Sequence, residues 1–208
     1  MADEFLLYIS AAQDLEIERD LIARIVTEIP VTLGWRIYQS PLKGGLLNHE
    51  ALRKADLHLL LIGSDIRAPI GYEWVLARKA GRQPILFRKT GIPVTPAGER
   101  FIREINEVTT WNKFEDSASL RIEILKLITD HIIENAIHFA LRADEYQGLI
   151  NWREDLVHEK PGQIQEQPGG AGDSSVVLSR ERYIPKEGRL IGARKSDQNR
   201  GYERIGEQ

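Results

Sequence analysis

The chain has 208 residues, of which 42% are hydrophobic and 28% are charged, so its length suits one core with an appendage rather than two full domains. Its formal net charge of -3 at pH 7 gives no overall basic surface for nucleic acid or for an anionic membrane. The chain contains no cysteine, which excludes disulfides, thiolate zinc sites and a cysteine nucleophile. No stretch approaches about 18 consecutive apolar residues, so we expect a cytoplasmic protein with neither a signal peptide nor a membrane span.

The first part of the chain alternates short apolar runs with amphipathic segments. The apolar runs predict strands at 4–10, 34–41, 56–65, 84–89 and 107–114. The segments between them predict helices at 11–30, 49–55, 71–80 and 98–106. The run "DLHLLLIGSD" is apolar on both faces, which is typical of a central parallel strand covered by helices. The alternation predicts an α/β fold with a doubly wound, five-stranded parallel sheet and right-handed crossovers.

The C-terminal part begins with a strong helical pattern. From Ser117 to about Leu141, apolar residues recur every three or four positions and predict one long amphipathic helix. At 1.5 Å per residue this helix would be about 37 Å long, which is more than the sheet needs, so we expect its distal half to dock on a partner. We expect an α/β domain with this helix over 1–142, a helical extension over 143–158, and a flexible linker and poorly structured tail over 159–208. The tail contains one short strand-like run.

Candidate ligand-binding residues follow the first and third predicted strands. In an open parallel sheet, ligands bind beyond the carboxyl ends of the strands, near the point where the strand order reverses. The residues expected there are Ser10, Ala11, Asp14, Gly63, Ser64 and Asp65. The small residues leave room for a ligand, whereas Ser10 and Asp14 are equally suited to capping the next helix with their side-chain oxygens.

Glu73 lies in the first turn of the helix predicted at 71–80. The helix macrodipole favours an ionised carboxylate there by about 0.3–1 kcal/mol, which fits a solvated surface acid and a reacting carboxylate equally well. The neighbouring Tyr72 and Trp74 have flat rings that suit stacking on a base or a nicotinamide, although Trp74 also suits the core.

Other chemistry finds less support in the sequence. His131 and His138 share a helix face, but no carboxylate lies at metal-like spacing beside them, so we expect no metal site. His58 falls inside the central strand and is interpreted as a core residue. The chain has neither a phosphate-binding loop ending in Lys and Ser or Thr nor a GxGxxG motif, which disfavours a nucleotide kinase or a dinucleotide-dependent dehydrogenase. Nucleic-acid binding is disfavoured because the basic residues after position 180 are offset by acids.

Two stretches resemble a known family. "LYISAAQDLEIERDLI", with Ser10, Asp14 and the pair Glu18 and Arg19, resembles the opening of a bacterial TIR-like domain family. In that family a strand ending in Ser leads to a helix that begins Asp-Leu and continues with Glu-Arg. "ADLHLLLIGSDI" resembles the third strand of the same family.

A third stretch, "GYEWVLARKAGRQPILF", resembles both the TIR-like pattern and that of nucleoside 2-deoxyribosyltransferases. In those enzymes a Glu is followed by Ala four residues on and by Gly eight residues on, then by a basic residue and a strand that begins with Pro. Counted from Glu73, the matching residues are Ala77, Gly81 and Arg82, and Pro84 comes one position late.

The resemblance covers about residues 4–130 and implies both a fold and an activity. It implies a flavodoxin-like sheet and cleavage of an N-glycosidic bond in NAD or a nucleoside by Glu73, with NAD as substrate and no bound cofactor. It also implies substrate contacts by the loop residues and by Arg19, a role in bacterial defence or signalling, and activity on assembly into a homo-oligomer. Some members act only through assembly, so a non-catalytic interaction module with a protein partner on the long helix or the tail stays open. A nucleotide-binding protein of the deoxyribosyltransferase type stays open as well.

Overall fold

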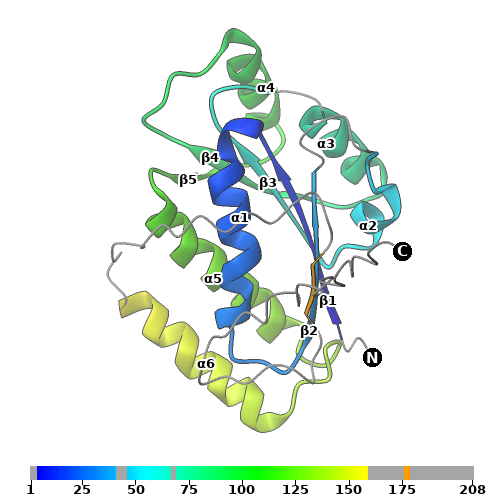
Figure 1. Cartoon of the computed structure of the whole chain (residues 1–208), viewed down its shortest axis with the longest axis vertical. Helices are drawn as coiled ribbons and strands as arrows, with labels where there is room; N and C mark the ends of the chain where they lie inside the picture. Colours follow the sequence, from blue (N-terminus) through cyan, green and yellow to red (C-terminus); the bar gives the residue numbers. More distant parts are fainter. Residues whose placement is uncertain (1–3, 41–45, 67–68, 159–175, 179–208) are drawn as a thin grey trace, which may run out of the picture.

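A computed structural model of the chain describes residues 4–40, 46–66, 69–158 and 176–178 (Figure 1). The linker and tail expected at 159–208 lie outside the described residues, apart from 176–178. The strands are β1 (Glu4–Ala11), β2 (Gly34–Gln39), β3 (Leu57–Ile62), β4 (Ile85–Lys89), β5 (Asn112–Phe114) and β6 (Val176–Leu178). The helices are α1 (Glu16–Ile25), α2 (His49–Lys54), α3 (Ile70–Lys79), α4 (Pro96–Asn106), α5 (Ser117–Glu134) and α6 (Ala143–His158), with 3-10 turns at Gln13–Leu15 and Val26–Glu28.

Strands β1 to β5 form a parallel sheet in the order β5-β4-β3-β1-β2. The predicted α/β class with a flavodoxin-like, doubly wound, five-stranded parallel sheet is therefore confirmed. The short β6 adds to the β2 edge as an antiparallel strand, with Val176 paired to Ile37. The strand order reverses between β1 and β3, and in such sheets the crevice beyond the carboxyl ends of these two strands is the usual ligand site.

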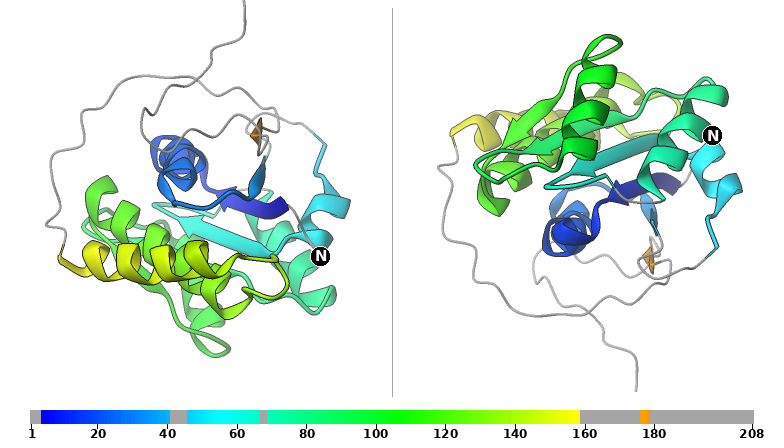
Figure 2. Two further views of the ribbon diagram at one scale, coloured as in Figure 1. Left: turned by 90° about the horizontal axis from the view of Figure 1, so that it is seen from below. Right: turned by 90° about the horizontal axis from the view of Figure 1, so that it is seen from above.

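Helices cover both faces of the sheet. In Figure 1, α1 and α5 lie to the left of β1 and β2, whereas α2 and α3 lie to their right. The end-on views of Figure 2 show the same arrangement, with the strands between the two groups of helices. Successive side chains of a strand point to opposite faces, and β1 follows this rule along its whole length. Phe5, Leu7 and Ile9 enter the main core under α1 and α5, while Tyr8 packs under α2 and α3.

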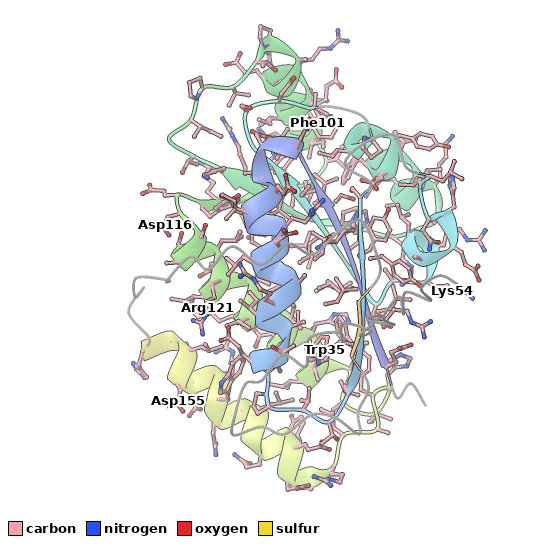
Figure 3. All side chains as sticks on the ribbon, viewed as in Figure 1. Trp35, Lys54, Phe101, Asp116, Arg121 and Asp155 are labelled. Carbon is pink, nitrogen blue, oxygen red and sulfur yellow. The ribbon has the colours of Figure 1, made fainter. Side chains whose placement is uncertain are left out.

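The main core lies between the sheet and the α1–α5 layer. Phe5 is central to it, with ring centroids 5.1 Å from Trp35 and 5.3 Å from Phe139. Trp35 lies on β2 toward the lower end of the sheet in Figure 3. At the surface of the same layer, the Arg121 guanidinium on α5 forms an ion pair with Glu28, which follows α1.

The helix predicted to reach Leu141 ends earlier, at Glu134. Asn135 leaves the helical conformation, with φ -109 and ψ 26, and its side-chain amide donates a 2.8 Å hydrogen bond to the His131 carbonyl oxygen. The chain then turns, with Ala140 at φ 51, and Phe139 reaches the core from this turn. Phe139 is therefore buried because the turn directs it into the core, and not because the helix extends that far.

Helix α6 covers the part of α5 that was expected to dock on a partner. Leu149 and Leu156 on α6 join the main core, and Trp152 packs against it. The Glu145 carboxylate, near the start of α6, accepts a 3.1 Å hydrogen bond from the backbone N–H of Thr32, ahead of β2. The distal half of α5 is thus packed within the same chain. Among the helices that the structure describes, none combines the length and the apolar character required to cross a bilayer.

Candidate functional site

Glu73 is a buried carboxylic acid under helix α3. It lies in the first turn of α3 and its side chain is 0% exposed. Ile70 and Ala77 are buried on the same helix, at spacings of three and four residues from Glu73. These spacings place the three side chains on one helix face, and that face lies against β1. The interpretation of Glu73 as a solvated surface acid is therefore wrong.

Two hydroxyl groups hold the Glu73 carboxylate. The Tyr8 hydroxyl on β1 donates to Oε1 at 2.7 Å, and the Ser40 hydroxyl, directly after β2, donates to Oε2 at 2.6 Å. Ser40 is itself fixed to β1, because its backbone N–H donates a 2.9 Å hydrogen bond to the Ile9 carbonyl oxygen. Both carboxylate oxygens are thus oriented by groups from adjacent strands.

A second buried pair lies beside the carboxylate. Ser10 is two residues after Tyr8 on β1, so it faces the same side of the sheet, and its Oγ lies 2.8 Å from Nε2 of His58 on β3. The His58 ring meets the Tyr8 ring edge-on, with centroids 5.1 Å apart. We call the five side chains the Glu73 cluster: Tyr8, Ser10, Ser40, His58 and Glu73. All five are at least 95% buried.

Burial dominates the acid–base properties of the Glu73 cluster. It raises the pKa of Glu73, and the neighbouring hydroxyl groups of Ser40, Ser10 and Tyr8 counteract this rise only in part. Burial also raises the pKa of Tyr8, with the nearby Glu73 charge and the hydrogen bond to it acting in the same direction. Burial lowers the pKa of His58 to about 3. Tyr8 and His58 are therefore neutral near pH 7, and Glu73 is the group of the cluster that can carry charge.

The loops after β1 and β3 are joined through Asp14. Its Oδ2 accepts hydrogen bonds from the Ser64 backbone N–H at 2.6 Å and from the Ser64 hydroxyl at 2.7 Å. Neither the 3-10 turn at Gln13–Leu15 nor α1 has a side-chain N-cap hydrogen bond. The capping interpretation of Ser10 and Asp14 is therefore wrong, because Ser10 pairs with His58 and Asp14 bridges to the β3 loop.

An open pocket of about 270 Å³ lies between these loops, at the point where the strand order reverses. Its lining residues are Ala12, Gln13, Asp14, Ser64 and Asp65. The volume is close to the lower end of the range of about 300–1,000 Å³ that is typical of ligand pockets. Ala12 follows Tyr8 and Ser10 at spacings of two residues and packs with Ile70 at the start of α3. The pocket therefore continues the row of β1 side chains that begins at the Glu73 cluster.

Gly63 allows the close approach of the two loops. A Cβ atom added at Gly63 would lie 2.3 Å from Asp14 Oδ2, so Gly63→Ala must push Asp14 away from Ser64. We expect this substitution to lower the free energy of unfolding by about 1–2 kcal/mol, because charge-assisted hydrogen bonds are lost. Gly148→Ala, inside α6 with nothing within 4 Å of the added Cβ, is expected to raise it by up to about 1 kcal/mol. Urea unfolding of both variants checks the pair, and a fully stable Gly63→Ala protein contradicts the prediction.

The aromatic residues beside Glu73 do not face it. Successive helix residues point about 100° apart, so Tyr72 is 54% exposed, with its ring beside His49 on α2. Trp74 is half-buried against the α4 side of the sheet, and the Arg78 guanidinium lies 5.6 Å from its ring centroid. The structure places neither ring against the carboxylate, and stacking of either ring on a ligand stays a prediction. The aromatic partner of Glu73 is Tyr8.

Two other expected contact residues belong to the opposite face of the sheet. Ala11 packs into the main core under α1 and α5. Arg19 is buried on α1, where its Nη2 lies 3.0 Å from Asp20 Oδ1 and its Nη1 has no hydrogen-bond partner. The resemblance implied that Arg19 contacts a substrate. The position of Arg19, on the face of the sheet opposite to Glu73, does not support this contact. Next to it, Glu18 forms a 2.6 Å ion pair with Lys89 at the end of β4.

Sequence reasoning missed three members of the Glu73 cluster. The sequence places Tyr8 only within an apolar strand and Ser40 only at the end of the next strand. The interpretation of His58 as a core residue is confirmed by its burial, but its contact with Ser10 was not predicted. A usable signal for Tyr8 was its spacing of two residues from Ser10, which puts both on one face of β1. Ser40 had the weaker signal of a polar residue at a carboxyl strand end.

Within the described residues, no three His, Asp or Glu side chains come together as metal ligands.

Fold and site together define an α/β protein with a buried carboxylic acid at the carboxyl edge of a flavodoxin-like sheet. Comparisons of the chain with models of protein families, with curated proteins and with solved structures gave no match.

Proposed function

We propose that this protein is a TIR-like N-glycosidase that cleaves the bond between ribose and nicotinamide in NAD, or the equivalent bond of another nucleotide. The observation that carries the proposal is the Glu73 carboxylate, oriented through both oxygens by Tyr8 and Ser40 at the carboxyl edge of the sheet. The neighbouring pocket at the strand-order reversal supports it, because this is where parallel α/β sheets bind nucleotides.

One carboxylate suffices for this reaction. The bond from ribose C1′ to the nicotinamide nitrogen breaks with its electron pair going to the nitrogen, so the cationic ring leaves as neutral nicotinamide. The sugar develops oxocarbenium character, which an anionic carboxylate stabilises or traps covalently. Water then adds to C1′ and releases one proton. No general acid is needed for the leaving group, unlike in the cleavage of an O-glycosidic bond.

The Glu73 cluster suits the role of a preorganised anion. Tyr8 and Ser40 donate hydrogen bonds and carry no charge near pH 7, so they orient the carboxylate without neutralising it. Fixed dipoles in a site from which water is excluded act more strongly on a developing charge than solvent does. Because burial raises the pKa of Glu73, activity is expected to rise with pH as this carboxyl group ionises.

A second candidate, a non-catalytic interaction module, is favoured by the complete burial of Glu73. The carboxylate is 0% exposed, so catalysis requires it to become accessible to a substrate bound in the pocket lined by Ala12 and Asp14. In a non-catalytic protein the Glu73 cluster would instead serve as a buried polar network that fixes the packing of α3 on the sheet.

The test is incubation of the purified full chain with NAD, followed by chromatographic measurement of free nicotinamide. The protein is tested at low and high concentration and with a crowding agent, because an assembly-dependent enzyme is active only in the concentrated samples. A parallel sample with a nucleoside and a free acceptor base separates hydrolysis from glycosyl transfer. Release of nicotinamide supports the proposal, and absence of any cleavage or transfer in all samples favours the interaction module.

A further inference from the structure

Helix α3 carries apolar side chains on the side that faces away from the sheet. Tyr72, Val75 and Lys79 follow one another at spacings of three and four residues, which places them on one face of the helix. Val75 is 43% exposed, and Tyr72 and Lys79 are exposed as well. We call these three residues the α3 stripe. It presents an aromatic ring, an aliphatic side chain and a cation to solvent, while Glu73 on the same helix is buried.

Further basic residues lie around the cationic end of the α3 stripe. Arg53 is in the last turn of α2, and Arg78 is in the last turn of α3 beside Lys79. Arg82 joins the two helices, because its Nε donates a 3.2 Å hydrogen bond to the Arg53 carbonyl oxygen. All four side chains are exposed, and none of them forms an ion pair with another described residue. The positive charge at this end of the stripe therefore favours an acidic partner.

Helix α6 carries a similar stripe with the opposite charge. Tyr146, Ile150, Glu154 and Val157 follow at spacings of four, four and three residues, so they share one face of the helix. Tyr146 is 39% exposed and Val157 is 53% exposed, and Glu154 is exposed beside them. We call these four residues the α6 stripe. Helix α6 contains four acidic residues and one arginine, so the stripe belongs to an acidic helix.

The two stripes hold a large share of the exposed apolar side chains. The structure exposes eight large hydrophobic residues in the part of the chain that it describes, and four of them belong to the α3 and α6 stripes. Single exposed apolar residues are ordinary at a protein surface. Apolar residues that share a helix face and lie beside unpaired charge are instead typical of an interaction surface.

The α3 and α6 stripes belong to opposite sides of the molecule. In Figure 1, α3 lies at the upper right and α6 at the lower left. The two end-on views of Figure 2 also separate the helices. Within one chain the stripes therefore do not meet, and a single two-fold axis cannot bring both stripes of one copy against those of another. A contact between the α3 stripe of one copy and the α6 stripe of the next is head-to-tail and can repeat.

We propose that the α3 stripe of one copy of this chain binds the α6 stripe of a second copy, so that copies associate head-to-tail. The apolar side chains of the two helices pack together, and Lys79 pairs with Glu154 of the partner subunit. Charge selects this arrangement, because a contact of either stripe with its own kind brings like charges together. Two helices bury less than the about 1,200–2,000 Å² of a stable complex, so the association is weak and depends strongly on concentration.

The association does not depend on the proposed reaction, whereas its effect on catalysis rests on that proposed function. Helix α3 carries Glu73 on its buried face and the α3 stripe on its outer face. A second copy therefore binds the helix that covers the carboxylate, and assembly acts directly on the element that shields the candidate site.

Chemical cross-linking tests the contact, because the chain has no cysteine of its own. The full chain with both Val75→Cys and Val157→Cys is treated at high concentration with a long bismaleimide and separated on a denaturing gel. A ladder of dimers, trimers and longer species is expected, because each copy then has one thiol on each side. Each single variant is expected to stay monomeric, since its thiol faces a stripe without cysteine.

The control for cross-linking by chance collision is Val75→Cys combined with Val108→Cys. Val108 is 57% exposed and belongs to neither stripe, so this chain is expected to stay monomeric. A ladder that is no stronger for the Val75 and Val157 pair than for this control overturns the proposal. Dimers of the single Val75→Cys variant also overturn it, because they show that α3 binds α3.

Exchange of the two charges identifies the contact by sedimentation equilibrium, without cysteine variants. Lys79→Glu and Glu154→Lys are each expected to weaken the association about tenfold, because an attraction becomes a repulsion. Mixing the two variants is expected to restore it, since alternating copies pair an acid with a lysine at every contact. Lys113→Glu, exposed on β5, is the matched control and is expected to leave the association unchanged.

A mixture that associates no better than either variant alone overturns the proposal, as do single variants that associate like the wild type. Neither experiment contains NAD. A chain that assembles but releases no nicotinamide therefore contradicts the proposed function alone, and a chain that releases nicotinamide as a monomer contradicts the effect of assembly on the site.

Discussion

The Glu73→Gln variant is expected to release nicotinamide from NAD about 10²–10³ times more slowly than the wild type. Gln keeps the size of the side chain and its place under α3 but cannot supply the negative charge that stabilises an oxocarbenium-like ribose. In the wild type, Tyr8 and Ser40 each donate a hydrogen bond to one carboxylate oxygen. The amide nitrogen of Gln replaces one of these oxygens and cannot accept such a bond. Initial rates of nicotinamide release, measured on wild type and variant at equal concentration, check the prediction.

Glu99→Gln is the matched control for this loss. Glu99 is also an acid in the first turn of a helix, α4, but it is exposed. Its replacement is expected to leave the rate within about twofold of the wild type, since an exposed charge in water has little influence at a distance. A Glu73→Gln protein that is folded and as active as the Glu99→Gln protein would show that Glu73 is not the reacting carboxylate.

The stability of the Glu73→Gln variant relative to the wild type is expected to rise with pH. Burial raises the pKa of Glu73 above its usual value of 4.5, so between the two values the native state holds a proton that the unfolded chain has released. The stability that this group contributes is fully present below pH 4.5 and is lost as pH rises toward the folded-state pKa. The free energy of unfolding of the wild type falls by up to about 1.4 kcal/mol per pH unit in this range. The Gln variant has no titrating group at this position and lacks this dependence on pH. Urea unfolding of both proteins from about pH 4 to about pH 8 measures the difference.

Glu145→Gln is expected to respond to pH with the opposite sign. Burial raises the pKa of Glu145, but hydrogen bonds from Thr32 and Arg142, together with the Arg142 charge, outweigh it and leave the pKa lowered. This carboxylate therefore stabilises the fold above its unfolded-state pKa, and the contribution is lost as pH falls through its folded-state value. Glu145→Gln should lose stability relative to the wild type as pH rises, whereas Glu73→Gln should gain it. Parallel pH profiles for the two variants would contradict the assignment.

The sheet could be predicted from the sequence because its signals are local. The apolar run of β3 and the strand-helix alternation are properties of neighbouring residues, and parallel topology follows from them with few alternatives. The end of α5 could not be predicted in the same way. The apolar period continues to Phe139, but the helix ends at Glu134 and Phe139 reaches the core from the turn that follows.

The candidate site was predictable at Glu73 but not around it. Ile70, Glu73 and Ala77 carry a helix-period signal for a shared buried face, which also implies that Tyr72 points elsewhere. The contact between Tyr8 and Glu73 joins residues 65 positions apart, and no local pattern specifies which rotation of α3 brings them together. Long-range hydrogen bonds of this kind follow from the packed fold.

The two faces of strand β1 have different roles. Its odd-numbered residues from Phe5 to Ala11 pack in the main core. On the other face, Tyr8, Ser10 and the adjoining Ala12 line the candidate site. Single substitutions at alternate positions can therefore remodel the chemistry of this protein while its core stays intact. An insertion or deletion of one residue in β1 would turn the core residues toward the candidate site and the site residues toward the core. It would therefore disrupt the core and the candidate site together. Libraries that aim to change specificity should vary Ser10 and Ala12 together and keep Ile9 and Ala11 fixed.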